Sequence, residues 1–310
     1  GDLVLQVGTG YFGCRELDGR FSLARLRALV DAHPQIRAIE IKLSQGAKPG
    51  LGGVLPRQKI TPEIAAIRGI PTDRDCVSPA AHTAFGDVSS LLDFVESIAD
   101  ATGRPVGVKS AVGQPGFWDD LARQCDTTGR SVDFITIDGG EGGTGAAPLV
   151  FVDHVGLPFK VGFDRVHRVF RERGLSDRIV FVGSGKLGFP DTAFMAFALG
   201  CDMVNVGREA LMAIGCIQAQ RCHTNRCPTG IATQNWWLAR GLDPQLKSVR
   251  LANYLIMLRK DLLALSRACG LSHPSLVTAD HLEIVDDHFH GKSLHDLFGA
   301  PRGTRRKPAA

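Results

Sequence analysis

Three cysteines lie close together in the segment GCIQAQRCHTNRCPTG, residues 215–230. Cys216, Cys222 and Cys227 follow the spacing C-x5-C-x4-C, and a proline comes directly after the last of them. Three thiols grouped among Arg, His, Thr and Asn favour metal ligation over a disulfide framework or apolar packing. The spacing lacks the C-x2-C pairs of zinc ribbons, although His223 could complete a Cys3His zinc site. An iron–sulfur cluster held by three thiolates is the main expectation.

Charged side chains stand at the ends of two expected strands. Lys109 ends the apolar strand VGVKS, where a lysine is costly unless an anion or an electron-rich ring accepts it. Beside a flavin, such a lysine would stabilise negative charge on the reduced ring. Asp138 ends DFITID, and Glu141 lies in the loop that follows, which has five glycines between residues 139 and 145. So many glycines indicate close approach to a ligand or sharp turns. The two carboxylates could serve acid–base chemistry or could cap the loop.

Two glycine loops are candidates for binding a phosphate. Gly183-Ser184-Gly185 follows the strand IVFV, and Gly207 follows MVNV. These are the last two strands of the chain, and in a barrel the loops after the last two strands commonly bind phosphate through backbone N–H groups. The alternative is that both loops are only tight turns.

Lys48 is the only cation of the long loop QGAKPGLGG, residues 45–53. It could anchor a substrate carboxylate, or it could be a solvated lysine on a loop.

GTGYFG, residues 8–13, fits the dinucleotide pattern G-x-G-x-x-G after a strand. That pattern requires a helix to open at the glycines and an acidic residue to end the next strand. Here Tyr11 and Phe12 occupy the turn, and the next helix is expected only near Phe21. A glycine-rich barrel loop is therefore the favoured interpretation.

Short Val- and Ile-rich runs alternate with segments of helical period, which predicts parallel strands joined by right-handed crossovers. Glycine and polar residues gather after every strand, as in a barrel whose loops surround one mouth, whereas an open doubly wound sheet uses chiefly the loops at its switch point. We therefore expect a (β/α)8 TIM barrel with a C-terminal helical extension. Only six strands are visible, so the first one or two are expected upstream of Gly1. The expected strands are 3–7, 38–43, 106–110, 133–138, 179–183 and 202–207, and the expected helices are 21–33, 61–69, 89–103, 162–174, 190–200 and about 247–269.

The composition is that of an ordinary globular protein, with 44% hydrophobic and 22% charged residues and a net charge of +4. This charge is too small to indicate a nucleic-acid partner, and two tyrosines and three tryptophans offer little for base stacking. No apolar run is long enough to span a bilayer. We expect a cytoplasmic protein, with any membrane segment lying upstream of Gly1.

Three segments resemble signature segments of the FMN-binding synthase region of glutamate synthase, above all in its shorter stand-alone proteins. They are IEIKLSQGAKPGLGGVLP, ITIDGGEGGTGAAPL and GCIQAQRCHTNRCPTGIATQ, and the resemblance extends over residues 3–285. It implies an FMN-binding barrel over 1–285, with an iron–sulfur segment at 215–230 and C-terminal helices. Residues 286–310 would form a mostly polar, basic tail.

The resemblance also implies roles for individual residues. Cys216, Cys222 and Cys227 would ligate a 3Fe-4S cluster, and Lys109 would lie beside the flavin ring. Lys48 and Arg68 would lie at the 2-oxoglutarate site. The remaining residues expected to contact FMN, in part through its phosphate, are Asp138, Gly139, Gly183, Ser184, Gly185, Gly207 and Arg208.

The implied reaction is the reduction of an imine, formed from 2-oxoglutarate and ammonia, to L-glutamate. Electrons would come from ferredoxin or from an NAD(P)H-oxidising subunit. A glutamine-derived ammonia source would need a separate amidotransferase chain. Val54 stands where glutamate synthases typically carry a glutamine that helps to bind 2-oxoglutarate. An amino-acid synthase that uses another amine, such as methylamine, and a non-catalytic electron-transfer subunit are therefore the alternatives.

Overall fold

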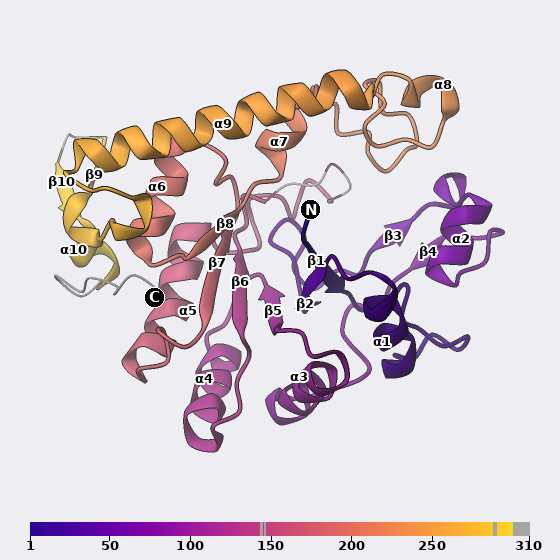
Figure 1. Cartoon of the computed structure of the whole chain (residues 1–310), viewed down its shortest axis with the longest axis horizontal. Helices are drawn as coiled ribbons and strands as arrows, with labels where there is room; N and C mark the ends of the chain where they lie inside the picture. Colours follow the sequence, from indigo (N-terminus) through magenta and orange to yellow (C-terminus); the bar gives the residue numbers. More distant parts are fainter. Residues whose placement is uncertain (143–144, 146, 288–289, 300–310) are drawn as a thin grey trace.

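The computed structural model describes residues 1–142, 145, 147–287 and 290–299. Its centre is a curled sheet of six parallel strands in the order β1-β2-β5-β6-β7-β8 (Figure 1). The strands follow one another as they do along the chain, which confirms a barrel-type sheet rather than a doubly wound one. β1 and β8 are the two edges, so these six strands form an open part-barrel. The strands are β1 Leu3–Val7, β2 Ile36–Lys42, β5 Val106–Ser110, β6 Phe134–Asp138, β7 Val180–Ser184 and β8 Met203–Asn205.

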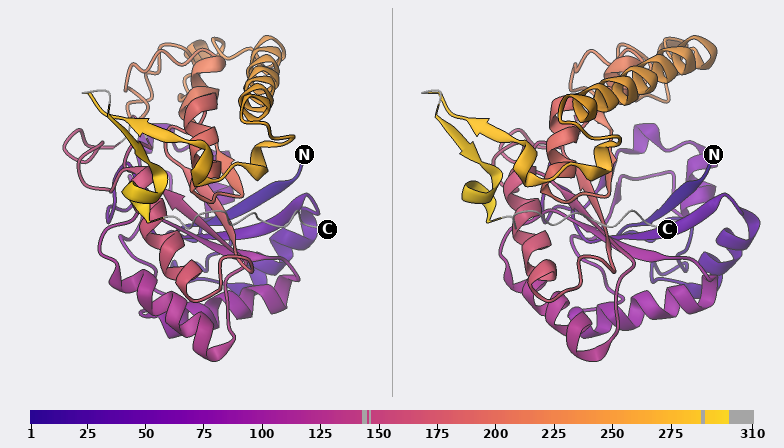
Figure 2. Two further views of the ribbon diagram at one scale, coloured as in Figure 1. Left: turned by 90° about the vertical axis from the view of Figure 1, so that its left-hand side faces the viewer. Right: turned by 60° about the vertical axis from the view of Figure 1, so that its left-hand side comes forward.

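Five helices pack beside one another along the convex face of the sheet (Figures 1 and 2). They are α1 Leu23–Ala32, α3 Val88–Thr102, α4 Gly116–Thr128, α5 Phe159–Glu172 and α6 Pro190–Leu199. Each connects two consecutive strands of the sheet, as the alternating pattern predicted. α4 was not among the helices expected from the sequence, and its N-cap, Pro115, makes no side-chain capping hydrogen bond.

Cap residues fix the helix ends where the sequence predicted them. Thr61 caps α2 (Pro62–Arg68) by accepting a hydrogen bond from the Ile64 N–H at 3.2 Å. Pro62 occupies the first helical position, and Gly69 ends the helix with a φ of 64°. A φ of this sign strains residues that carry a Cβ, which explains the glycine.

The two faces of the central strands differ in chemistry because side chains alternate along a strand. The apolar set faces the helices and is almost completely buried; it includes Ile39, Ile41, Val106, Val108, Ile135, Ile137 and Phe181. Burial of each such side chain stabilises the fold by about 1.5–3 kcal/mol. The opposite, concave face carries polar and charged side chains, starting with Glu40 and Lys42 on β2.

Strand register arranges these polar side chains in rows. Lys42 pairs with Lys109 across β2 and β5, and Lys109 pairs with Thr136 across β5 and β6. A second row, closer to the carboxyl ends of the strands, joins Asp138 to Ser184 and Ser184 to Asn205. Residues in register on adjacent parallel strands point to the same face, so the backbone alone gathers these groups.

Further elements surround the carboxyl ends of the strands. A small lobe, called the outer lobe below, contains the antiparallel pair β3 (Val54–Leu55) and β4 (Cys76–Val77), η1 (Arg57–Lys59) and α2. After α7 (Arg208–Ala213), the cysteine segment leads through α8 (Trp236–Ala239) into the long helix α9 (Pro244–Ala268), which packs on α6 and α7 (Figure 1). Among the described helices, none combines the length and the apolar character that crossing a membrane requires.

The chain continues through η2 (Pro274–Leu276), η3 (Ala279–His281) and β9 (Glu283–Val285). In the segment expected to be a polar, basic tail, 286–310, the described part holds β10 (Gly291–Ser293) and α10 (Leu294–Phe298). Leu294 is completely buried in the core. Residues 288–289 and 300–310 lie outside the described residues.

Candidate functional site

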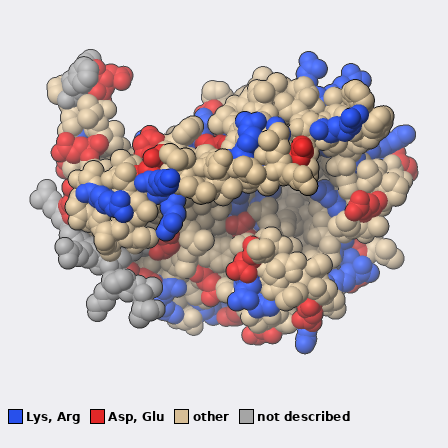
Figure 3. Space-filling view, turned by 45° about the horizontal axis from the view of Figure 1, so that its top comes forward, with Lys and Arg blue, Asp and Glu red and all other residues tan. Residues whose placement is uncertain are grey.

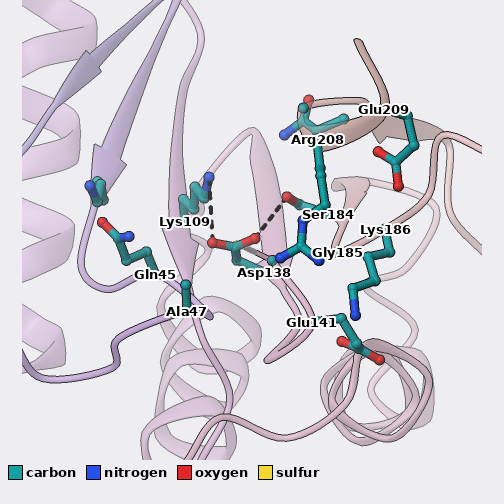
Figure 4. A pocket seen from close by; sticks show the side chains of 14 residues that line it. Gln45, Ala47, Lys109, Asp138, Glu141, Ser184, Gly185, Lys186, Arg208 and Glu209 are labelled. Carbon is teal, nitrogen blue, oxygen red and sulfur yellow. Dashed lines mark hydrogen bonds and ion pairs between the residues drawn. The ribbon is translucent and has the colours of Figure 1, made fainter. Parts of the chain in front are cut away.

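A pocket of about 200 Å³ opens at the carboxyl ends of β2, β5, β6, β7 and β8 (Figure 4). Six residues predicted from the sequence to bind a cofactor line it: Lys109, Asp138, Ser184, Gly185, Gly207 and Arg208. The pocket also contains residues that sequence reasoning missed, namely Lys42, Gln45, Ala47, Lys186, Asn205 and Glu209.

Asp138 holds three parts of the pocket together. Its carboxylate accepts hydrogen bonds from the Ser184 hydroxyl at 2.7 Å and from the Gly46 N–H at 2.9 Å. The Lys109 Nζ lies 3.7 Å from Asp138 Oδ2 (Figure 4). Asp138 is only 8% exposed, so this network fixes the loop after β2 and the ends of β5 and β7 at one point.

Lys42 adds a second cation beside Lys109. Burial, reinforced by the positive charges of Lys109 and Lys48, lowers the pKa of Lys42, while the carboxylates of Asp138 and Glu40 oppose this shift. Lys42 and Lys109 therefore form a positively charged pair in the pocket lining, and the charge of Lys48 adds to their field. The sequence contains a pattern that could have predicted Lys42. The alternation in AIEIKL puts Glu40 and Lys42 on one face of the strand and Ile39 and Ile41 on the other.

Glu40 lies beneath the lysines and is 7% exposed. Its carboxylate accepts hydrogen bonds from the Thr136 hydroxyl at 2.7 Å and from the Gln6 side-chain amide at 2.5 Å. The sequence analysis did not single out any of these three residues. The negative charge of Glu40 balances part of the positive charge of the lysines above it.

Glycines and Arg208 form the opposite wall. Gly185 has a φ of 132°, a backbone conformation that L side chains rarely adopt, and a Cβ on Gly207 would enter open space. Arg208, the first residue of α7, extends into the pocket (Figure 4). Gly139 and Gly183 serve packing behind this wall, because a Cβ on either would meet the Phe159 side chain or backbone at less than 3.0 Å.

Glu141 caps the start of a helix, as one of the two interpretations of this residue predicted, and it also lines the pocket. Its two carboxylate oxygens lie 3.0 and 2.8 Å from the Phe159 N–H, at the start of α5. Negative charge at a helix N-terminus is favourable, so Glu141 stabilises α5 and closes the glycine-rich loop. Residues 143, 144 and 146 of that loop lie outside the described residues.

The two predicted substrate residues occupy different surroundings. Lys48 donates to the Gly52 carbonyl at 3.4 Å and contributes to the charge that acts on Lys42, but it does not line the pocket. Arg68 ends α2 in the outer lobe, where its guanidinium lies 4.8 Å from the centre of the Phe12 ring. The structure therefore does not bring Arg68 into the pocket.

The cysteine segment lies next to the same end of the sheet. The Lys59 ammonium donates to the carbonyls of Cys222 and Ala232 at 3.0 and 3.3 Å, and His223 Nδ1 lies 3.2 Å from the Gly145 carbonyl. These contacts tie the segment to the outer lobe and to the glycine-rich loop.

The three thiols are not gathered into one site. Among the residues that the structure describes, no three His, Cys, Asp or Glu side chains form a group that could hold a metal ion. Burial of Cys227 raises the pKa of its thiol, but hydrogen bonds from the Thr229 hydroxyl and from nearby backbone N–H groups outweigh this and lower it overall.

Tyr11 joins the first loop to the strand that carries Lys42. Its hydroxyl, which is buried, accepts hydrogen bonds from the N–H groups of Thr83 and Ala84 at 3.0 and 3.1 Å. The hydroxyl in turn donates a hydrogen bond to His82 Nδ1, 3.1 Å away. His82 Nε2 donates to the Lys42 carbonyl at 2.9 Å. Burial lowers the pKa of His82, consistent with this neutral form. No helix opens at the glycines of this loop, so the barrel-loop interpretation is confirmed.

Replacing Tyr11 by Phe should reduce the free energy of unfolding by about 2 kcal/mol, because three groups lose a hydrogen bond to the buried hydroxyl and one of them, His82, is itself buried. Urea unfolding monitored by circular dichroism measures this change. The chain's other tyrosine is the matched control: Tyr254 donates a single hydrogen bond to the Gly188 carbonyl, and Tyr254→Phe should cost about 1 kcal/mol. Equal costs for the two variants would contradict the role of the Tyr11 hydroxyl.

The pocket suits a large anionic ligand. Its lining has four cationic side chains against three carboxylates, and glycine backbone lines one side. The cations are Lys42, Lys109, Lys186 and Arg208, and the carboxylates are Asp138, Glu141 and Glu209. The chemistry of the lining and the open space at Gly207 fit a phosphate-bearing ring such as FMN.

Comparison with known proteins places this pocket in context. Residues 1–272 match the family model described as the conserved region in glutamate synthase. The chain is 38% identical over 283 residues to the glutamate synthase large subunit-like protein YerD of Bacillus subtilis, which covers 91% of this chain and 53% of that protein. It is 41% identical over 274 residues to an archaeal glutamate synthase (NADPH) of Methanocaldococcus jannaschii, covering 87% of this chain and 50% of the relative. The chain thus spans about half the length of these curated relatives.

Among solved structures, a variant of flavocytochrome b2 with sulfite bound superposes with a TM-score of 0.51 at 11% identity. The superposition covers 99% of this chain and 62% of that one. At this identity the likeness concerns the fold alone, and it supports the barrel-type architecture.

Proposed function

Because this chain belongs to the glutamate synthase family, we propose that it forms the FMN-binding part of a glutamate synthase-type oxidoreductase. The observation that carries the proposal is the convergence of Lys109, Asp138, Ser184, Gly185 and Arg208 on one cationic pocket at the carboxyl ends of the strands. In a barrel, this end of the sheet is where catalysis takes place.

Bound FMN would supply hydride transfer to the carbon of an imine. Two side chains of the pocket are suited to support this transfer. Lys109 would stabilise the negative charge of the reduced ring, since its ammonium faces the pocket from β5. Asp138 would hold Lys109 in position through their ion pair. The loops at Gly183–Gly185 and Gly207–Arg208 would hold the phosphate, with Arg208 as its cation.

The proposed substrate is the imine formed from 2-oxoglutarate and ammonia, and the product is L-glutamate. Lys48 and Arg68 are the proposed partners of the substrate carboxylates, which requires the outer lobe to move Arg68 toward the pocket. Val54 is 56% exposed on β3 in the same lobe. Because it cannot form the hydrogen bonds of a glutamine, a larger or less polar amine such as methylamine is the second candidate.

The proposed electron entry is a 3Fe-4S cluster on Cys216, Cys222 and Cys227. Support comes from the grouping of the three thiols along the sequence and from the hydrogen bonds that favour a thiolate at Cys227. The proposed electron donor is ferredoxin or an NAD(P)H-oxidising subunit, and a separate amidotransferase would deliver ammonia from glutamine.

Turnover of the complete protein tests these proposals. With dithionite as reductant, we expect the protein to form glutamate from 2-oxoglutarate and ammonia. Mass spectrometry distinguishes this product from the N-methylglutamate that would form with methylamine. The same preparation should contain FMN, iron and sulfide. A protein without flavin would contradict the oxidoreductase, and zinc in place of iron would contradict the cluster alone.

A further inference from the structure

The lining of the pocket includes the lysines Lys42, Lys109 and Lys186, whose ammonium groups carry protons that can be given up. Reduction of an imine consumes a proton at nitrogen as well as a hydride at carbon. A side chain that supplies such a proton accelerates the reaction by about 100- to 10,000-fold. Arg208 cannot supply it, because a guanidinium keeps its proton in proteins. Among the cations of the lining, a lysine is therefore the possible donor.

Lys42 differs from the other two lysines because it has no carboxylate partner. The Lys109 Nζ lies 3.7 Å from Asp138 Oδ2, and the Lys186 Nζ lies 3.7 Å from Asp153 Oδ1. In the part of the chain that the structure describes, the Lys42 ammonium forms no ion pair of this kind. A nearby negative charge holds an ammonium in its protonated form. Lys42 is therefore the lysine of the lining that releases its proton most readily.

The charges around Lys42 also favour release of the proton. Lys42 is in strand register with Lys109, and because adjacent strands lie about 5 Å apart, the two ammonium groups extend side by side from one face of the sheet. Burial lowers the pKa of Lys42, and the positive charges of Lys109 and then Lys48 lower it further. The carboxylates of Asp138, on β6, and Glu40, on β2, act in the opposite direction without reversing the shift.

The backbone around Lys42 is anchored on two sides. His82 Nε2 donates a hydrogen bond to the Lys42 carbonyl at 2.9 Å, and the Leu43 N–H donates to the Lys109 carbonyl at 2.8 Å. His82 is buried, and burial lowers its pKa, so it adds no charge beside Lys42. Side chains on a rigid strand keep a reactive geometry better than side chains on loops. Lys42 is thus held facing the same space as Lys109.

The carboxylates of the lining are less suited to donate a proton. Asp138 lies beside the Lys109 ammonium, and Glu141 accepts the hydrogen bond of the Phe159 N–H, so both sites favour the ionised form. An ionised carboxylate has no proton to give. Glu209 belongs to α7, which follows β8, and three strands separate β8 from β2 in the sheet.

We propose that Lys42 is the catalytic residue that donates a proton to the imine nitrogen. This role rests on the proposed function, because it completes the reduction of the imine to L-glutamate. As the hydride reaches the imine carbon, the Lys42 Nζ–H bond breaks and its proton passes to nitrogen. The π electron pair of the C=N bond forms the new N–H bond, and loss of the hydride from reduced FMN is the oxidation that balances this reduction.

Neutral Lys42 then recovers a proton from water. The carboxyl ends of the strands lie on the side of α9, and the view of that side in Figure 3 shows the molecule hollowed next to this helix. The pocket opens at these strand ends, so water can reach the lysine between turnovers.

The test is reoxidation of the complete, dithionite-reduced protein by 2-oxoglutarate and ammonia in a stopped-flow spectrometer. Lys42→Arg keeps the positive charge but cannot release a proton, so the maximal rate at which the flavin band returns should fall about 100-fold. Lys42→Met should lose about as much. Fluorescence titration with FMN should give a Kd for Lys42→Arg within about threefold of wild type, because the charge of the pocket is kept. The matched control, Lys260→Arg on the exposed side of α9, should reoxidise within about twofold of wild type.

The pH dependence gives a second readout. Only the protonated form of Lys42 can donate, so the ratio of the wild-type rate to the Lys42→Arg rate should fall as pH rises through the pKa of Lys42. Taking this ratio removes the pH dependence of imine formation, which both proteins share. Competitive labelling with acetic anhydride, read by peptide mass spectrometry, measures the same pKa without substrate. Lys42 should become reactive at a lower pH than Lys260, because its surroundings lower its pKa.

A maximal rate for Lys42→Arg within about threefold of wild type would overturn the proposal, since a charge alone would then suffice. Weaker apparent affinity for 2-oxoglutarate at an unchanged maximal rate would also overturn it, because Lys42 would then bind a substrate carboxylate. Labelling of Lys42 only at the pH of Lys260 or above would do the same, as would loss of FMN from both Lys42 variants. These results leave the proposed function intact. Wild-type protein that is not reoxidised with either ammonia or methylamine rejects the proposed function itself, and its proton donor with it.

Discussion

Replacement of Lys109 by Met is expected to lower kcat/KM for glutamate formation by about 100- to 1,000-fold. The Lys109 side chain is 17% exposed and faces the pocket between Lys42 and Thr136, which are its partners in strand register. Met has a similar length but no charge, so the pocket would keep its shape and lose the cation that lies beside Asp138. Steady-state rates with 2-oxoglutarate and ammonia, normalised to bound flavin, measure the loss.

A surface lysine provides the matched control for this substitution. Lys260 is exposed on α9, away from the residues that line the pocket. Lys260→Met should keep kcat/KM within about twofold of wild type, because an isolated surface charge contributes little. The flavin midpoint potential offers a second readout: Lys109→Met should make it more negative, since the reduced ring loses a stabilising charge. Full turnover by Lys109→Met would instead favour a non-catalytic electron-transfer subunit.

Replacement of Asp138 by Ala is expected to cost about 3–5 kcal/mol of unfolding free energy and most of the bound flavin. Three groups lose a buried partner together: the Gly46 N–H, the Ser184 hydroxyl and the Lys109 ammonium. The loop after β2 is also released from its anchor. Urea unfolding and the flavin content of the purified protein measure the two losses.

Asp133 at the other end of β6 is the matched control for Asp138. Its carboxylate accepts one backbone hydrogen bond, from the Val106 N–H at 2.7 Å, and its side chain reaches solvent. Asp133→Ala should cost about 1 kcal/mol and leave flavin content unchanged. If both variants lost the same stability and kept their flavin, Asp138 would not be the centre of the pocket.

Sequence periodicity was sufficient to predict the sheet and the residues at its strand ends. The six expected strands are all present within a few residues of their predicted bounds, because alternation and glycine stops are local signals. Lys109, Asp138, Ser184 and Arg208 meet since parallel strands end at the same edge. Lys42 and Glu40 follow the same rule but were not predicted. The alternation of charged and apolar residues in AIEIKL was used to predict a strand, and its charged side chains were not assigned to the polar face that lines the pocket.

Other features depend on tertiary packing that no local pattern encodes. The direction of the outer lobe decides whether Arg68 reaches the pocket, and this direction is set by contacts such as that of Arg68 with Phe12. The cysteine segment has no strand register to fix its thiols. Its described long-range anchors include Lys59 to the Cys222 carbonyl and the Asn225 amide to the Gln58 carbonyl. Cysteine spacing therefore suggested a ligand type without determining where the thiols lie.

The most direct test of the central claim is anaerobic reoxidation of the complete protein. After reduction by a stoichiometric amount of dithionite, the flavin absorption band should return when 2-oxoglutarate and ammonia are added together, with one glutamate formed per flavin reoxidised. Either compound alone should leave the band bleached, because both are needed to form the imine. A band that stays bleached with 2-oxoglutarate and either ammonia or methylamine would contradict the assignment of this pocket to amino-acid synthesis.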